Sequence, residues 1–308
     1  MSVDLRAAAA DYLAARRARG YRLADHDWIL RAFLDELEAR DLTTISITDA
    51  LAFAVSRPET QRCAQAARLQ AIRGLAAYVH GLDPAAAQLI PARLIAAKVT
   101  RRIPYLYTGE QIAALMASTA DLSPAIFAAS MHTLIGLIAA TGLRSGEAFA
   151  LDVEDLDVER AVLTATGKYG KQRLVPLHAS TVQALADYQR VRSAHAAPRG
   201  ALFLGAKGGR LNPNTARAAF RALVEAADLP ARPGCPTPRL HDLRHGFAVD
   251  TLIDAHRQGV DVDARIAALA TYLGHVNPLN TYWYLTASPE LMAVVRDRIT
   301  AQHARGRQ

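Results

Sequence analysis

The stretch that organises this chain begins RLHDLRHGFAVDTL at residues 239–252 and ends LGHVNPLNTYWYL at residues 273–285. His241 and Arg244 are three residues apart in a segment whose apolar positions have helical spacing. Residues with this separation on a helix point to the same side. The pair therefore predicts a helix face that is both basic and hydrogen-bonding.

The end of the stretch carries a histidine and a phenol. His275 and Tyr284 are nine residues apart, and Asn277 and Pro278 lie between them. An Asn-Pro pair suits the N-cap and first position of a helix, so the phenol is expected on a short helix. Tyr282 precedes Tyr284 by two residues, and two such side chains point about 200° apart on a helix. Only one of the two phenols can face a shared site.

Two further basic groups lie upstream. Arg144 stands in ATGLRSGEAFALDVEDLD at residues 140–157, and Lys168 stands in TGKYGKQRLVPL at residues 166–177. Together the four stretches resemble the tyrosine recombinases, the phage-integrase and Xer-like family, over roughly residues 105–295. The resemblance is specific because order, residue type and spacing all agree, whereas each stretch alone is a weak signal.

Length and composition fit a globular protein of two domains, since 51% of the 308 residues are hydrophobic and 21% are charged. Helical spacing recurs through residues 1–85, whereas residues 151–177 have the shorter period of strands. The resemblance implies a mainly α fold. It would comprise a helical core-binding domain at 1–85, a linker at 86–104, an α-rich catalytic domain with a small antiparallel β-sheet at 105–295, and a basic tail at 296–308.

Local signals predict where several elements begin. Thr108 is a candidate N-cap for a helix over TGEQIAALMAS, and Asn212 followed by Pro213 marks the start of another helix. A turn at residues 168–171 would join two short strands.

The chain is basic, with a net charge of +7 and a pI near 9.6. This favours a polyanionic partner, because neutralising phosphates releases counterions from nucleic acid; an Ala- and Arg-rich coding bias is the alternative. Arginines 62, 68 and 73 are spaced along the last helix of the N-terminal region. They would be either solvated helix charges or, as the resemblance implies, contacts to double-stranded DNA. The predicted DNA-binding residues are Arg16, Arg17, Arg62, Arg73, Arg101, Arg102 and Lys171.

Cysteine usage and apolar content indicate the cellular compartment of the protein. Cys63 and Cys235 are the only cysteines and lack CxxC spacing, so neither a disulfide framework nor a zinc knuckle is indicated. The N-terminal stretch lacks an apolar signal core, and no window approaches eighteen uninterrupted apolar residues. The sequence therefore predicts a cytoplasmic protein without a membrane partner.

One competing motif is metal-binding. HDLRH places His241 and His245 at i and i+4, which suits zinc, and Asp242 stands where a metalloprotease has its Glu. Asp is a methylene shorter, Arg244 would bring a cation to the metal, and no third ligand is identifiable. We therefore expect no metal site and no other cofactor.

Breaking a phosphodiester without metal requires a nucleophile, cations on the nonbridging oxygens and an acid for the leaving 5′ oxygen. By resemblance, Tyr284 attacks the scissile phosphate to give a 3′-phosphotyrosine, which a 5′ hydroxyl later reverses without ATP. Arg144 and Arg244 match the family's two arginines, whose planar forks bind nonbridging oxygens. Lys168 matches the hairpin lysine that protonates the leaving oxygen.

The remaining site residues also follow from the resemblance. His241 would hydrogen-bond the phosphate and help manage the tyrosine proton, and His275 would donate to a nonbridging oxygen. Glu147 matches the acidic residue that orients the cations; an exposed helix position is its alternative. Lys171 remains a rival to Lys168, and the family spacing of nine residues after His275 selects Tyr284 over Tyr282.

Single residues also have simpler interpretations. Arg144 could form a surface ion pair with Glu147 or Asp152, and Arg244 could be a solvated helix charge. At the level of the whole protein, the alternative is a DNA-binding accessory protein that keeps the fold without cutting. The resemblance instead implies a homotetramer on paired DNA sites, or a hetero-assembly with a related recombinase, with a tail that docks on a neighbouring subunit or stays solvated.

Overall fold

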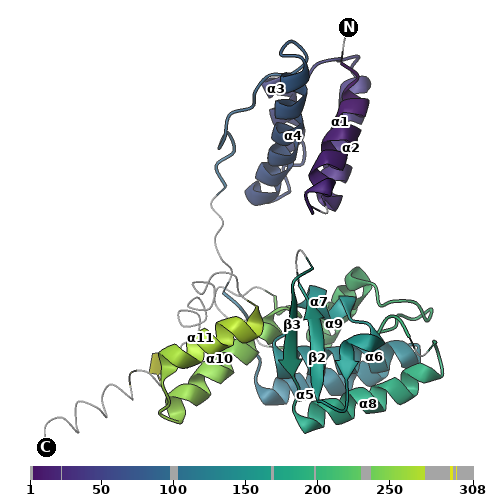
Figure 1. The fold of residues 1–308 in the computed structure, drawn as a ribbon, viewed down its shortest axis with the longest axis vertical. Helices are drawn as coiled ribbons and strands as arrows, with labels where there is room; N and C mark the ends of the chain where they lie inside the picture. Colours follow the sequence, from purple (N-terminus) through teal and green to yellow (C-terminus); the bar gives the residue numbers. More distant parts are fainter. Residues whose placement is uncertain are drawn as a thin grey trace, which may run out of the picture. The chain divides into compact units, whose positions relative to one another are not determined.

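The chain forms two compact units, residues 1–101 and 102–308, in the computed structural model. Figure 1 draws its elements. Both units consist mainly of helices. The described residues also form one three-stranded antiparallel sheet. The mainly α fold predicted from the sequence is confirmed. The structure describes residues 3–21, 23–97, 103–167, 170–197, 199–229, 237–274, 292–293 and 296.

The N-terminal unit contains four helices, α1 (Leu5–Ala18), α2 (Ala24–Glu38), α3 (Ile47–Val55) and α4 (Arg62–Leu82). Asp4 caps α1, because its carboxylate accepts from two backbone N–H groups of the first turn. Helix α4 turns a row of side chains at three- and four-residue spacing into the core, and these pack on α1, α2 and α3. The unit therefore has a hydrophobic core of its own.

The second unit begins with α5 (Gly109–Ala117) and a short 3-10 turn, η1 (Ser118–Asp121). Thr108 caps α5 as predicted, and Gln111 completes a capping box. Helix α6 (Ala125–Thr141) is apolar around most of its circumference, which is typical of a helix buried on all sides. It packs against α5, α8 (Ala179–Ser193) and α10 (Asp242–Arg257).

Gly142 ends α6 in the left-handed conformation with φ of 61°. A Cβ atom here would lie 2.5 Å from a ring carbon of Phe247 and 3.0 Å from a methyl carbon of Leu273. Glycine is therefore required both by the backbone conformation and by the close approach of two helices. The chain turns at this point into α7 (Ser145–Ala150) and η2 (Val153–Asp155).

The sheet consists of β1 (Leu156–Asp157), β2 (Val162–Thr166) and β3 (Gln172–Pro176) in that order. Its register pairs Ala165 with Arg173 and Leu163 with Val175. These four residues share one face, since alternate residues of a strand point the same way. Leu174 points to the opposite face and is 68% exposed.

The described part of the second unit also includes α9 (Pro213–Ala226) and α11 (Val262–Leu273). Helix α9 starts at the predicted Asn212 cap with Pro213 in its first turn. Helices α10 and α11 lie side by side and share an apolar cluster. The turn was predicted at residues 168–171, which in the chain separate β2 from β3, and Lys168 and Tyr169 are outside the described residues.

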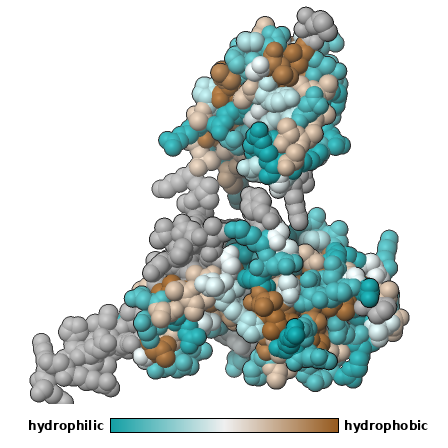
Figure 2. Space-filling view, viewed as in Figure 1, coloured by the Kyte–Doolittle hydropathy of each residue, from teal (hydrophilic) through white to brown (hydrophobic). Residues whose placement is uncertain are grey.

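The described surfaces of both units carry hydrophilic and hydrophobic side chains side by side (Figure 2). No helix of the described residues is long and apolar enough to cross a membrane.

Candidate active site

Arg144 and Glu147 form the first half of the site. Arg144 is the N-cap of α7, and its backbone N–H donates to Oε2 of Glu147 at 2.9 Å. Its guanidinium donates to Oε1 of the same carboxylate at 2.7 Å and to the carbonyl of Gly274 at 3.0 Å. The Glu147 side chain is only 4% exposed, so the interpretation of Glu147 as an exposed helix residue is wrong. The ion pair considered from the sequence does form, but its carboxylate is buried.

Arg173 of β3 is a site residue that sequence reasoning missed. It donates from Nη1 and Nη2 to the two Glu147 oxygens at 2.9 and 2.8 Å, and from Nε to the carbonyl of Tyr272 at 2.9 Å. Its side chain is largely buried on the inward face of the strand. Glu147 is therefore held by two arginines.

The electrostatics of Glu147 follow from these contacts. Burial raises the pKa of the carboxyl group, because it disfavours the charged form. Hydrogen bonds from Arg173 and from the backbone and guanidinium of Arg144 outweigh burial and lower the pKa to about 2. Glu147 is thus a carboxylate throughout the near-neutral pH range.

Arg244 is buried in the second half of the site. It lies in the first turn of α10 and is 1% exposed. Nη1 donates to the carbonyl of Gly142 at 2.6 Å, and Nη2 donates to the carbonyl of Leu273 at 2.9 Å. The interpretation of Arg244 as a solvated helix charge is therefore wrong. Asp242 beside it is also buried and accepts from Arg239 at 2.9 Å.

The C-terminal end of α11 joins the two halves. Three consecutive carbonyls, those of residues 272–274, accept hydrogen bonds from Arg173, Arg244 and Arg144 respectively. Carbonyls at a helix C-terminus lack intrahelical partners and carry partial negative charge, so cations stabilise them. Gly274 has a φ of 66°, and a Cβ atom there would lie 3.2 Å from Cδ of Arg173. The absence of a side chain at this position thus allows the arginine to approach.

His241 precedes α10 as its N-cap residue and is half-buried. Its ring meets that of His245 edge to face, with centroids 5.1 Å apart. Burial and the charge of Arg244 lower the pKa of His241 below 6.5. The imidazole is therefore mainly neutral near pH 7 and can accept a proton. Among the described residues, no group of three His, Cys, Asp or Glu side chains could hold a metal ion.

The structure thus brings together Arg144, Glu147 and Arg244 from α7 and α10, with His241 on the turn before α10. Three predicted catalytic residues lie outside the described residues, namely Lys168, His275 and Tyr284. His275 is the residue that follows Gly274 in the chain. Tyr282 and the Asn277-Pro278 pair also lie outside the described part.

Residues 106–290 match the model of the Phage integrase family. The chain belongs to this family. It is a tyrosine-type site-specific DNA recombinase, as the sequence predicted.

Relatives and solved structures agree with this assignment. The recombinase is 37% identical over 303 residues to y4rB of Sinorhizobium fredii (strain NBRC 101917 / NGR234), an integrase/recombinase by name, with 96% of each chain covered. It is 32% identical over 204 residues to tyrosine recombinase XerD of Mycobacterium leprae (strain TN), covering 63% of this chain and 60% of XerD. The Tn1549 transposon integrase in complex with transposon right end DNA has a TM-score of 0.62 at 17% identity, covering 97% of this chain and 98% of that one. XerA recombinase has a TM-score of 0.51 at 18% identity, covering 97% and 99%. At these two identities the likeness concerns the fold.

The arginines of the recombinase's N-terminal unit differ in how accessible they are. Arg62 is exposed and Arg73 is partly exposed. Arg16 lies over the ring of Tyr21, with its guanidinium carbon 4.2 Å from the ring centroid. Arg17 is exposed and forms a 2.5 Å ion pair with Asp27. Arg101 and Arg102 lie outside the described residues.

Arg68 is neither a solvated charge nor an exposed DNA contact. It is 7% exposed, its guanidinium carbon lies 4.2 Å from the ring centroid of Phe53, and it donates to the carbonyl of Ala54 and to Ser56 Oγ at 3.3 Å. At 100° per residue, residues 62 and 73 of α4 point to nearly the same side, about 20° apart, whereas residue 68 points about 120–140° away from both. The three arginines therefore do not form one face.

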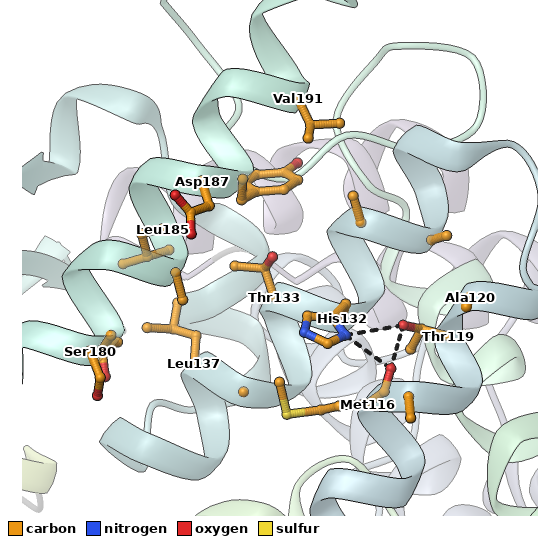
Figure 3. A pocket seen from close by; sticks show the side chains of 17 residues that line it. Met116, Thr119, Ala120, His132, Thr133, Leu137, Ser180, Leu185, Asp187 and Val191 are labelled. Carbon is orange, nitrogen blue, oxygen red and sulfur yellow. Dashed lines mark hydrogen bonds between the residues drawn. The ribbon is translucent and has the colours of Figure 1, made fainter.

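The recombinase also has a cavity of about 620 Å³ between α5, η1, α6 and α8. Figure 3 shows its mainly small, apolar lining, with His132 directed toward Met116 and Thr119. His132 Nδ1 lies 2.9 Å from the carbonyl of Met116 and 3.4 Å from Thr119 Oγ1. None of the described residues predicted for catalysis lines this cavity.

Proposed function

We propose that this recombinase cleaves and rejoins DNA through a 3′-phosphotyrosine intermediate at Tyr284, without metal or ATP. The Tyr284 oxygen forms a bond to the scissile phosphorus as the bond to the 5′ oxygen breaks, and Lys168 supplies the proton to that oxygen. Arg144 and Arg244 stabilise the negative charge on the nonbridging oxygens. Attack by a 5′ hydroxyl then releases the tyrosine and rejoins the strand.

The observation that carries this proposal is the meeting of three arginines at the end of α11, directly before His275 in the chain. The chain therefore enters the His275-to-Tyr284 segment at the cations that its chemistry needs. The Arg144 side chain is 36% exposed, and Nε and one hydrogen on each terminal nitrogen have no acceptor among the described residues. A guanidinium anchored on one side in this way is oriented before a phosphate arrives.

His241 and His275 complete the proposed site. A neutral His241 can take the proton that Tyr284 loses on attack, and its lowered pKa supports that role. His275 donates to a nonbridging oxygen in the proposal, and Glu147 orients the cations through the contacts already described.

The proposed substrate is double-stranded DNA, bound by a homotetramer on paired sites or by a hetero-assembly with a related recombinase. Structural neighbours include XerH bound to palindromic difH substrate and a lambda integrase dimer bound to a COC′ core site. The fold is shared with these DNA complexes at 22% and 19% identity. The proposed DNA contacts remain those predicted from the sequence, Arg16, Arg17, Arg62, Arg73, Arg101, Arg102 and Lys171.

Covalent trapping tests the chemistry. Nicked suicide DNA, built from the sequences flanking the gene's own element, is incubated with wild type, Tyr284→Phe and Tyr282→Phe in the presence of EDTA. We expect a denaturant-resistant adduct from wild type and Tyr282→Phe and none from Tyr284→Phe. An adduct lost only in Tyr282→Phe would refute Tyr284 as the nucleophile. DNA binding with no adduct from any form would refute the phosphotyrosine mechanism.

A further inference from the structure

Arg173 and Arg144 both donate hydrogen bonds to each of the two carboxylate oxygens of Glu147. Oε1 accepts from Nη1 of Arg144 at 2.7 Å and from Nη1 of Arg173 at 2.9 Å. Oε2 accepts from the backbone N–H of Arg144 at 2.9 Å and from Nη2 of Arg173 at 2.8 Å. The carboxylate thus accepts two hydrogen bonds from each of the two arginine residues.

This sharing sets the charge that Arg144 presents. Two guanidinium groups and one carboxylate leave this cluster with one net positive charge. Without Arg173, Glu147 would face Arg144 alone and neutralise it, and a low-dielectric environment strengthens that pairing. A neutralised Arg144 would attract a phosphate less strongly and would be held closer to the carboxylate.

Arg173 also anchors the segment that leads to the proposed nucleophile. Its Nε donates to the carbonyl of Tyr272 at 2.9 Å, two residues before Gly274, whose carbonyl Arg144 binds. One rigid strand residue therefore contacts both the carboxylate partner of Arg144 and the end of α11.

We propose that Arg173 is a positioning residue for cleavage. By donating to both oxygens of Glu147, it offsets the negative charge of that carboxylate and so keeps the positive charge of Arg144 available to the scissile phosphate. Arg173 acts through Glu147 and does not touch the substrate. The inference rests on the proposed function, because it concerns the phosphate that Arg144 is proposed to bind.

The test uses the full chain and the same suicide DNA, and it measures the rate of adduct formation at saturating DNA. We expect Arg173→Gln to be slower by about 10²-fold, the scale on which losing one charge-stabilising group lowers a rate. In the double variant Arg173→Gln with Glu147→Gln, the carboxylate that neutralises Arg144 is gone. Its rate should recover at least about tenfold relative to Arg173→Gln, because Arg144 again carries a net charge.

Two further variants separate this role from a loss of folding. Arg192→Gln removes three guanidinium bonds to backbone carbonyls of the same unit and no carboxylate contact. It should lower the thermal midpoint without changing the adduct rate of the folded protein. Arg173→Lys keeps a positive charge beside Glu147 but loses the two-pronged contact and the Nε bond to Tyr272, so its rate should fall between those of wild type and Arg173→Gln.

The outcomes are distinct. Adduct formation by Arg173→Gln at the wild-type rate would overturn the inference, as would a double variant as slow as Arg173→Gln with folding intact. A rate for Arg173→Lys as low as that of Arg173→Gln would also overturn it. Absence of an adduct from wild type would refute the proposed function and this inference with it.

Discussion

Replacing Glu147 by glutamine should remove one identifiable part of the acid sensitivity of the recombinase. The buried carboxylate accepts from both Arg144 and Arg173, and its pKa is lowered from 4.5 to about 2. The unfolded chain would bind a proton at this residue below pH 4.5, whereas the folded chain would not do so until about pH 2. Glu147 therefore contributes stability that is fully present above pH 4.5 and is lost as the pH falls toward 2.

The magnitude follows from the difference between 4.5 and about 2. At about 1.4 kcal/mol per pH unit, this difference amounts to about 3 kcal/mol of unfolding free energy. Little of it is screened by solvent, because the side chain is 4% exposed. Glutamine retains the shape but neither the charge nor the titration.

Urea unfolding of wild type and Glu147→Gln, followed by circular dichroism at pH 6, 5, 4 and 3, measures the effect. The two unfolding free energies should differ by a constant amount above pH 4.5. The difference should then narrow by about 1.4 kcal/mol per pH unit as the pH falls. Subtraction removes the other carboxylates, because both proteins carry them. Parallel curves from pH 6 to pH 3 would refute the buried, doubly paired Glu147.

Three other perturbations have expected outcomes. In Arg244→Lys, a single ammonium cannot donate to both backbone carbonyls as the guanidinium does. The change should lower the free energy of unfolding by about 1–3 kcal/mol and the adduct rate by on the order of 10²-fold; a wild-type rate would contradict the proposed role of Arg244. Wild type should lose unfolding free energy as the pH falls below 6.5, because His241 protonates more readily in the unfolded chain than in the folded one. His241→Gln should not show this loss; an unchanged pH profile in the variant would contradict the lowered pKa. Arg62→Ala should reduce the slope of log affinity for DNA against log salt by about one, whereas Arg68→Ala should lower the thermal midpoint and leave that slope unchanged; the reverse pattern would refute their assignment.

The sequence indicated the architecture because its signals are local. Thr108 and Asn212 cap the helices that they were expected to cap, since a capping side chain bonds to backbone groups within three residues of itself. The order and spacing of Arg144, Lys168, His241, Arg244, His275 and Tyr284 likewise sufficed to identify the family.

The position of Arg173 shows what local signals omit. It follows two lysines that carry the hairpin resemblance and reads as the start of a strand. Apolar alternation does not decide whether Arg173 or Leu174 points inward, because both Leu174 and Val175 are apolar. The pairing of Ala165 with Arg173 decides it, and Leu174 is left on the outer face.

The sequence by itself determined the family, the mainly helical fold and the ends of several helices. Only the tertiary structure decided that Arg68 is buried and that Arg173 and Arg144 both bind the Glu147 carboxylate. The physical reason is the range of the contacts. Spacing along the chain sets the direction of a side chain relative to its own helix or strand. Its partner is set by packing between distant segments, as for Arg173 with Glu147, 26 residues away, and with Tyr272, 99 residues away.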